Sequence, residues 1–335
     1  MDNIGKPGTN GFNSHGFSLI ELLVAMAIFA VLMASVTMAF HTQQQSQVRE
    51  QMVLEMQQNV RGALQLMERE IRMAGYDPTV VWGTDGVDND GDDDIDESDE
   101  AQNDLAAALG ITMAQTFELR FGMDLNGDRD LGESNERIAY GFANKFDGDN
   151  GLRNGLVDYV AGNKDADGAA PIGRASGGAN LQGFAEDIEA VAFAYAFDMD
   201  MDGRIDRNAA DIIWAYDRDN DGELDTVLDT NGDGAINAQD DNNNDGRIGA
   251  GDAGSDLTPK VPLNRIRAVK IWLLARTPHP VRGHRETRTY VVGDKIIKGA
   301  DMNRDGSIND DQGLDHYQRR LLSTTVICRN MGLGL

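Results

Sequence analysis

A long apolar stretch near the start of the chain constrains this protein more than any other feature. Residues 19–40 are 22 positions with a single charged side chain, that of Glu21. About 20 apolar residues are enough for a helix to cross a bilayer. The pair Gly16-Phe17 stands before this stretch, whereas an ordinary secretory signal is cut after its apolar run. A cut after Gly16 would therefore leave the apolar helix at the N-terminus of the mature chain.

The helical pattern continues beyond the apolar stretch. From residue 41 to Gly75, apolar side chains recur every three or four positions with Gln, Glu and Arg between them, as on a helix with one apolar stripe. Gly75 is a typical C-terminal stop, and Pro78 forbids continuation. The pattern predicts one helix over residues 17–75. Its first part, 17–40, is apolar on all sides, and its second part has to pack on something, with a sheet expected and a coiled coil as the alternative.

Later segments alternate between apolar and polar side chains, as half-buried strands do. They lie at residues 117–121, 138–142, 191–197, 287–292 and 321–328, and residues 266–275 are apolar enough for a central strand. Residues 152–183 are rich in Gly, Ala, Asn and Asp and are interpreted as loops. The expected fold class is α+β, with a long N-terminal helix packed on an antiparallel β-sheet head.

The chain is strongly acidic, with a formal net charge of −26. Such a charge repels nucleic acid and anionic membrane surfaces and calls for counterions, of which divalent metal is the obvious candidate. A single cysteine, Cys328, excludes an internal disulfide, and its place in an expected strand indicates a buried thiol. The sequence contains no catalytic motif that we recognise, so we expect no enzyme.

The acidic segments repeat a metal-loop pattern. The spacing D-x-[DN]-x-[DN]-G with an apolar residue at position 8 is that of EF-hand calcium loops. Alternating side chains place oxygens around one ion, Gly at position 6 allows the sharp turn, and the residue at position 12 closes the coordination sphere. Five stretches fit, with these candidate ligands: Asp198, Asp200, Asp202 and Asp206; Asp217, Asp219, Asp221 and Asp225; Asp229, Asn231, Asp233 and Asp240; Asp241, Asn243, Asp245 and Asp252; Asp301, Asn303 and Asp305.

Three of the five loops follow one another at a 12-residue step. The loop at Asp301 has Gln312 at position 12, and the loops at Asp198 and Asp217 also have no acid there. The Asp217 loop, and with it the Asp198 loop, has to borrow a ligand. Two further stretches lack the glycine, which Asp93 and Arg129 replace; their candidate ligands are Asp88, Asp90, Asp92, Asp94 and Asp99, and Asp124, Asn126, Asp128 and Asp130.

The acidic insertions therefore cover residues 85–100, 124–136, 198–256 and 301–312. The loops abut without room for EF-hand helices, which predicts EF-like loops inserted in a β or loop context. Weak Ca²⁺ sites, with Kd about 10⁻⁴–10⁻³ M, are expected of extracellular modules of this kind. The alternative is an acidic, solvated surface that binds no metal.

The residues Gly16-Phe17-Ser18-Leu19-Ile20-Glu21, followed by the apolar run, resemble the class III signal of type IV pilins and pseudopilins. The resemblance implies a leader over residues 1–16, cleavage after Gly16 by a prepilin peptidase, and N-methylation of Phe17. A carboxylate inside an apolar span is costly unless paired. The implied partner of Glu21 is the freed amino group of Phe17, on the same subunit or a neighbour. A plain signal anchor is the alternative.

Residues 69–78, 265–277 and 319–326 resemble PilW-like minor pilins. That resemblance implies a β-rich head over residues 76–335, held first at the inner membrane and then in a pilus at the cell surface. It also implies priming of assembly at the tip, support of adhesion or twitching, and as partners other minor and major pilins, the prepilin peptidase and the inner-membrane assembly platform. The alternatives are a J-type pseudopilin of type II secretion and a membrane-anchored, calcium-binding adhesin that never polymerises.

Overall fold

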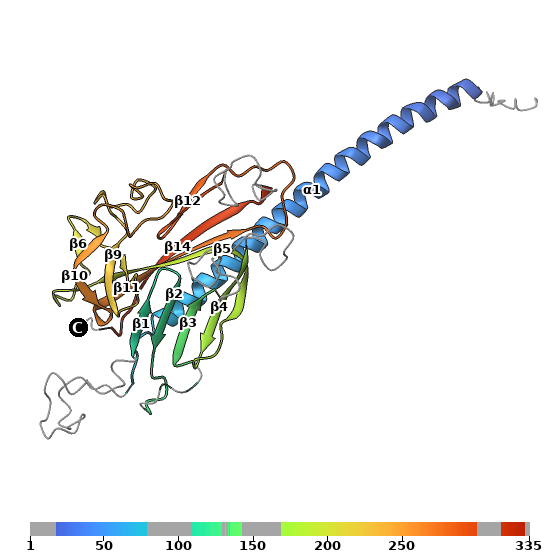
Figure 1. Ribbon diagram of the computed structural model, residues 1–335. Coiled ribbons are helices and arrows are strands. Elements are labelled where there is room, and N and C mark those ends of the chain that lie inside the picture. The colour runs from blue at the N-terminus through green and yellow to red at the C-terminus, as the bar shows by residue number, and fades with distance from the viewer. Residues whose placement is uncertain are drawn as a thin grey trace, which may run out of the picture. The chain divides into compact units, whose positions relative to one another are not determined.

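A computed structural model of the chain describes residues 18–78, 109–128, 131, 133, 135–142, 169–299 and 316–331. The chain divides into two compact units, residues 1–51 and residues 52–335. The first unit contains the apolar part of the N-terminal helix, and the second contains the remainder of that helix and the sheet (Figure 1).

The N-terminal helix, α1, covers Leu19–Ile71. Its last regular hydrogen bond runs from the Arg72 N–H to the Glu68 carbonyl, after which the Met73 N–H turns to the Glu70 carbonyl at 2.9 Å. Such tightening is common at helix ends. Gly75 then adopts φ +76° and donates its N–H to the Gly122 carbonyl of the sheet at 2.9 Å. The regular helix therefore ends four residues before the predicted stop, because the chain turns there to meet the sheet.

The described head is built of antiparallel strands, and ten of them form one sheet. The strands are β1 (Gly110–Ala114), β2 (Glu118–Gly122), β3 (Arg137–Gly141), β4 (Ala170–Ser176), β5 (Gln182–Phe197), β6 (Arg207–Asn208), β7 (Asp211–Ile212), β8 (Ala215–Tyr216), β9 (Glu223–Val227), β10 (Asp256–Pro262), β11 (Ile266–Arg276), β12 (Thr289–Val292), β13 (Lys295–Lys298) and β14 (Arg319–Ile327), with a 3₁₀ turn, η1, at Leu263–Arg265.

Strand β5 organises the sheet because it pairs with β4, β8 and β11. The large sheet runs in the order β1-β2-β3-β4-β5-β8-β9-β10, and β11 joins β5 to β14; β6–β7 and β12–β13 are separate two-stranded ribbons. The predicted α+β architecture with an antiparallel head is confirmed. The interpretation of residues 152–183 as loops is wrong in its described part, because β4 and the start of β5 lie there. The alternating pattern of a strand was not visible in this segment, because its Gly and Ala residues carry little apolar surface.

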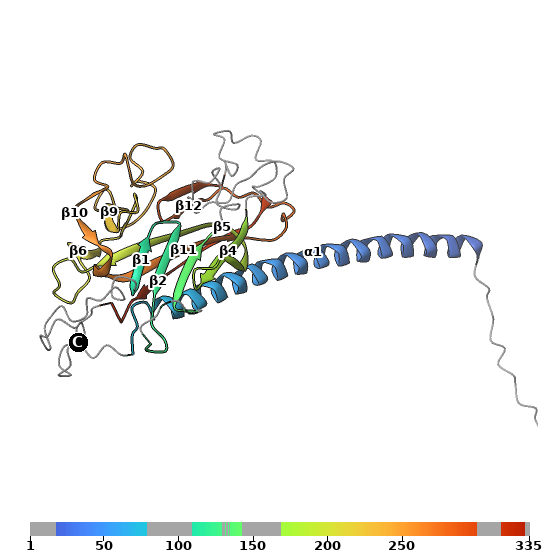
Figure 2. The ribbon, with the colours of Figure 1, turned by 60° about the horizontal axis from the view of Figure 1, so that its bottom comes forward.

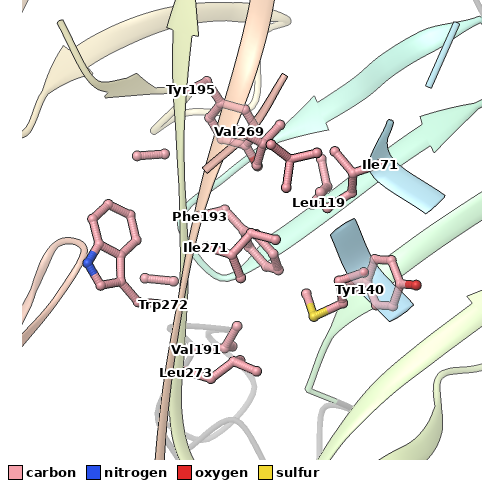
Figure 3. Packing of buried hydrophobic residues seen from close by; sticks show 14 of the residues in the cluster. Ile71, Leu119, Tyr140, Val191, Phe193, Tyr195, Val269, Ile271, Trp272 and Leu273 are labelled. Carbon is pink, nitrogen blue, oxygen red and sulfur yellow. The ribbon is translucent and has the colours of Figure 1, made fainter. Parts of the chain in front are cut away.

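The face of the sheet turned toward α1 is the main core. Phe193 and Ile271 stand opposite each other in the β5–β11 register and are fully buried. Figure 3 shows both on the same side of these strands as Ile71 of α1, with Leu119 and Tyr140 close by, and Trp272 on the other side. The buried residues of α1 all lie between Met56 and Ile71. The amphipathic second part of the helix therefore packs on the sheet, as its pattern predicted.

A polar contact fixes α1 to the sheet at this core. The Tyr140 hydroxyl hydrogen-bonds Glu70 of α1, and the Arg174 Nε donates to the same Glu70 oxygen, Oε2, at 2.8 Å. Burial, and next the hydrogen bond to Glu70, raise the pKa of Tyr140 well above its ordinary range. The phenol thus stays protonated and remains a donor to the carboxylate.

The opposite face of the sheet carries the β12–β13 ribbon. Gly293, in the turn of this ribbon, has φ +60° and lies so close to the sheet that an added Cβ would collide with the Ala192 Cβ. Alanines at 190, 192, 194 and 196 of β5 are all fully buried. These small side chains leave the room in which the ribbon approaches. In Figure 2 the loops between β5 and β10, coloured yellow to orange, gather beside β9 and β10.

Candidate functional site

The processing signal and the apolar helix form the first candidate site. Gly16 and Phe17 lie outside the described residues. Glu21, in the first turn of α1, accepts the Ser18 N–H on its Oε2 at 3.2 Å. The carboxylate therefore turns back along the helix toward its N-terminus, as in a capping box. A glutamate at this place satisfies one of the helix's first N–H groups.

The apolar part of α1 is exposed over its whole length. Leu19 is 77 % and Met38 is 76 % exposed, and the best 18-residue window of the helix has a mean hydropathy of 2.6 with none of it buried. This is the one membrane-spanning candidate by length and composition among the described residues. Apolar surface of this extent has to be covered by lipid or by other chains.

The acidic loops form the second candidate site. Four of them are fully described and are named by their first residue: the Asp198 loop (198–206), the Asp217 loop (217–225), the Asp229 loop (229–240) and the Asp241 loop (241–252). Between Phe197 and Asp256 the structure has the short strands β6–β9 and no helix. The resemblance to an EF-hand is thus limited to the loop itself, and the flanking helices of an EF-hand are absent from these residues, as the abutting spacing of the loops predicted.

The four loops share one turn. In each, the first aspartate accepts the N–H of the sixth-position glycine on Oδ2, at 2.9–3.1 Å. The glycines are Gly203, Gly222, Gly234 and Gly246, with φ +82°, +91°, +87° and +86°. The left-handed backbone explains why the pattern requires glycine at this position. The turn directs the side chains at positions 1, 3 and 5 around the loop.

Each loop is closed by one further aspartate, at one of two positions. In the Asp229 and Asp241 loops it is the twelfth residue: Asp240 accepts the Thr230 N–H at 2.9 Å, and Asp252 accepts the Asn242 N–H at 2.9 Å. In the other two loops it is the ninth residue. Asp206 accepts the Met199 N–H at 3.0 Å, and Asp225 accepts the Arg218 N–H at 3.2 Å. The loops that were expected to borrow a ligand are closed by their own ninth-position aspartates.

Two of the loops bring three carboxylates into one small space. Oxygens of Asp198, Asp200 and Asp206 lie within 4.8 Å of one another, and so do oxygens of Asp217, Asp219 and Asp225. Oxygens bound at 2.3–2.6 Å to one Ca²⁺ are separated by distances of this order. These two groups are therefore able to hold a metal ion. The Asp229 and Asp241 loops, which use Asn at position 3, do not bring three carboxylates together in this way.

Burial makes these carboxyl groups harder to ionise. It is the largest cause of the raised pKa of Asp206, Asp217 and Asp240. Backbone N–H donors oppose the shift, and neighbouring carboxylates add to it. A cation at any of these loops would offset both burial and repulsion.

Two basic side chains that sequence reasoning missed stand beside the loops. The Arg267 Nε, on β11, lies 3.6 Å from Asp198 Oδ2, and both side chains are almost fully buried. Lys260, on β10, contacts three aspartates of the Asp217 loop: Asp219, Asp221 and Asp225. No local pattern couples either residue to its loop, because the contacts depend on strand pairing.

The degenerate loop at Asp124 is partly described. The Gly127 N–H donates to Asp124 Oδ1 at 2.6 Å, and the Asn126 Nδ2 donates to Asp128 at 2.9 Å. Glu136, which sequence reasoning did not select, accepts the Leu125 N–H at 3.1 Å and so takes the place that the closing aspartate has in the other loops. Other predicted ligands lie outside the described residues: Asp88, Asp90, Asp92, Asp94, Asp99, Asp130, Asp301, Asn303 and Asp305.

The Asp241 loop is joined to the β12–β13 ribbon. The Ile248 N–H donates to the Asp294 carbonyl at 2.8 Å, and the Ile296 N–H donates to the Gly246 carbonyl at 2.9 Å. An ion pair between Arg247 and Asp294, at 3.2 Å, adds to these bonds. These three contacts therefore hold the Asp241 loop against the ribbon that packs on β5 and β11.

Comparison with known proteins gives two family matches. A family model described as "Prokaryotic N-terminal methylation motif" matches residues 11–37, and one described as "Type IV Pilus-assembly protein W" matches residues 167–330. No curated protein matches the chain. Among solved structures, a type IV-like pilin from Thermus thermophilus is similar at 13 % identity and a TM-score of 0.33, over 82 % of this chain and 97 % of that one.

Proposed function

The chain is a PilW-like type IV pilin, and from that premise we propose that it is a minor pilin that primes pilus assembly from the tip. In this proposal it supports surface attachment or twitching and has a structural role rather than an enzymatic one. Its domains are the leader 1–16, the pilin helix 17–75 and the head 76–335.

The observation that carries the proposal is the exposed apolar helix, whose first residues lie within a match to a methylation motif. The side chains from Leu19 to Phe40 include fourteen large hydrophobic ones that are at least half exposed. A single-pass anchor in the inner membrane covers them with lipid before assembly. In a filament, the corresponding helices of neighbouring pilins cover them instead. The motif at residues 11–37 favours the second destination, because it marks the chain for prepilin processing.

Glu21 has its role at the transfer from lipid to filament. Its carboxylate turns toward the start of the helix, where it accepts the Ser18 N–H. The amino group of a mature Phe17 would be the next donor in that direction. An ammonium and a carboxylate that lose water together stabilise each other more strongly than in water. We assign this pairing to the docking of the subunit among other pilins. In this proposal docking follows cleavage by the prepilin peptidase and takes place at the assembly platform.

The head is proposed to be stabilised by calcium at the cell surface. Two groups of three close carboxylates support this, as does the common turn of the four described loops. An ion that binds only the ordered loop stabilises it by about 2.7 kcal/mol at a hundredfold excess over Kd. Millimolar calcium outside the cell is the range in which weak extracellular sites fill.

Two other functions make different predictions. A J-type pseudopilin of type II secretion would use the same helix and leader, and its loss would block exoprotein release. An anchored adhesin that never polymerises would need neither Glu21 nor other pilins.

The test is deletion of the gene, with surface pili imaged and exoprotein release assayed in the same strains. Loss of pili with normal secretion, restored by the intact gene and not by Glu21→Ala, supports the minor pilin. Loss of secretion with normal pili identifies the pseudopilin. Full restoration of attachment by Glu21→Ala, with pili unchanged throughout, identifies the adhesin.

A further inference from the structure

Lys260 is placed at the Asp217 loop by strand pairing. It belongs to β10, whose Val261 pairs with Leu224 of β9, so that its side chain lies beside the loop that precedes β9. Its Nζ pairs with Asp221 and lies 3.5 Å from Asp219 Oδ2 and 3.9 Å from Asp225 Oδ2. One ammonium thus faces three carboxylates.

Asp225 points a buried oxygen into this group. Its side chain is 4 % exposed. Oδ1 accepts the Arg218 N–H at 3.2 Å and the Thr226 hydroxyl at 2.6 Å, while Oδ2 is buried and accepts no hydrogen bond. A buried carboxylate oxygen without a donor is costly. The nearest cation, Lys260, is 3.9 Å away, so this oxygen has no positive partner at hydrogen-bond distance.

The carboxylates that face Lys260 overlap with those that would hold an ion. Asp219 and Asp225 contact the ammonium, and together with Asp217 they form one of the two close groups of oxygens. A divalent ion among these oxygens would repel an ammonium held by the same residues. Lys260 is 38 % exposed and has a flexible stem, so it is able to withdraw into solvent.

We propose that the Asp217 loop is a divalent-cation site in which the Lys260 ammonium is an internal competitor of the ion. Calcium and the lysine bind the same carboxylates alternately, so the loop keeps a counter-charge whether or not it holds metal. This inference rests on the proposed calcium role of the head and assigns one of its sites a distinct behaviour.

The other described loops show why this site is distinct. In the Asp198 loop the cation is Arg267, which is 4 % exposed and lacks a path to solvent comparable to that of Lys260. Within the described residues, no lysine or arginine pairs with a ligand of the Asp229 or Asp241 loop. A calcium ion at either of those two loops would meet no competing ammonium, so competition between an ion and an exposed lysine is specific to the Asp217 loop among the described loops.

The test uses the processed full-length chain in detergent micelles at fixed ionic strength. An amine acetylating reagent is applied at pH 8 with CaCl₂ or with EGTA, and the modification of each lysine is measured by mass spectrometry. We expect calcium to raise the rate at Lys260 severalfold, because the released ammonium is no longer held by carboxylates. Lys298, exposed on β13, serves as the control and should not change.

A calcium titration by calorimetry completes the test with two variants. Lys260→Met should bind one ion roughly three- to tenfold more tightly, with the other ions unaffected. Lys298→Met should bind as the wild type does. Asp225→Asn should lose that ion even when combined with Lys260→Met, which shows that the effect belongs to this loop.

The outcomes separate the inference from the function on which it rests. If calcium binds but neither Lys260 labelling nor the Lys260→Met titration changes, the competitor is refuted and the calcium role of the head stands. If only Lys260→Met binds an ion, the competitor is supported and the stabilisation of the native head by calcium is refuted. If neither protein binds calcium at 10 mM, both are refuted.

Discussion

Arg319 donates two parallel hydrogen bonds to Glu189, from Nε to Oε2 at 2.6 Å and from Nη2 to Oε1 at 2.7 Å, inside the head. Both residues are more than 90 % buried. Arg276, which pairs with Arg319 across β11 and β14, also lies 3.7 Å from the same carboxylate. One glutamate of β5 therefore faces two buried guanidinium groups on two other strands.

Removing the Glu189 carboxylate should destabilise the head more than removing either arginine. Glu189→Gln leaves two buried positive charges side by side and is expected to lower the free energy of unfolding by about 3–5 kcal/mol. Arg319→Gln should cost less, because Glu189 keeps Arg276. The measurement is denaturant unfolding followed by the fluorescence of the buried Trp214 and Trp272.

Glu186 provides the matched control, since it lies on the same strand and is exposed. Glu186→Gln should change the unfolding free energy by less than about 0.5 kcal/mol. Equal costs for the Glu189 and Glu186 variants would show that the buried cluster does not support the head.

Processing should leave methylated Phe17 as the first residue. Mass spectrometry of the protein extracted from membranes should find this N-terminus, and a Gly16→Leu variant should keep residues 1–16. The expected cut lies directly after Gly16, so a bulky side chain at this position should hinder it. An N-terminus beyond Phe40 would remove the apolar helix and with it the pilin role.

Glu21→Ala should insert in the membrane and be processed, yet enter filaments about tenfold less than the wild type. That ratio corresponds to about 1.4 kcal/mol, a modest part of the cost of leaving a buried ammonium unpaired. The amounts in sheared pili and in membranes are compared by immunoblotting. Glu50→Gln, exposed on the same helix, is the control and should incorporate normally. Normal incorporation of Glu21→Ala would contradict the pairing with Phe17.

Calcium should protect residues 217–252 from proteolysis. The processed full-length chain is digested in detergent with millimolar calcium or with EGTA, beside a variant in which Asp229, Asp233, Asp241 and Asp245 are changed to Ala. We expect cleavage in this block only without calcium or in the variant, because each filled site adds about 2.7 kcal/mol at a hundredfold excess over Kd. Strands β11 and β14 should resist in all samples, since their core is apolar. Identical cleavage with and without calcium would mean that the loops are solvated acidic surface.

Cys328 should report the unfolding of the head. Its thiol is fully buried, and burial raises its pKa to about 12, although Arg267 opposes the shift. At pH 8 the thiolate population is about a thousandfold smaller than at the ordinary pKa of 9.0. A disulfide reagent should therefore not react with Cys328 in the native chain, and should react with it once denaturant has unfolded the head.

The same shift sets the sign of a pH effect. The folded state holds the proton more tightly than the unfolded state, so this contribution to stability is present below pH 9 and is lost as the pH rises toward 12. Cys328→Ala should remove this part of the decrease in unfolding free energy at high pH. The part that comes from the titration of lysines and tyrosines should remain. Rapid reaction of the native wild type at pH 8 would show that the thiol is accessible.

The features that the sequence determined by itself are those that depend on neighbours along the chain. The apolar run from Leu19 to Phe40 and the stripe that follows it predicted α1, because helical periodicity is local. The glycine at position 6 predicted the turn of the four described metal loops, since only a residue without Cβ adopts the left-handed backbone there at little cost. Alternation predicted β2, β3 and the second half of β5 for the same reason, and a continuous apolar run predicted β11.

Tertiary structure alone decided which distant groups meet. The register of β10 on β9 brings Lys260 to the Asp217 loop, and β11 brings Arg267 to Asp198. The junction of the Asp241 loop with the β12–β13 ribbon also became visible only in the fold. The physical reason is that strand pairing joins residues far apart in the chain, and the side chains that it brings together carry no mark of one another in the local sequence.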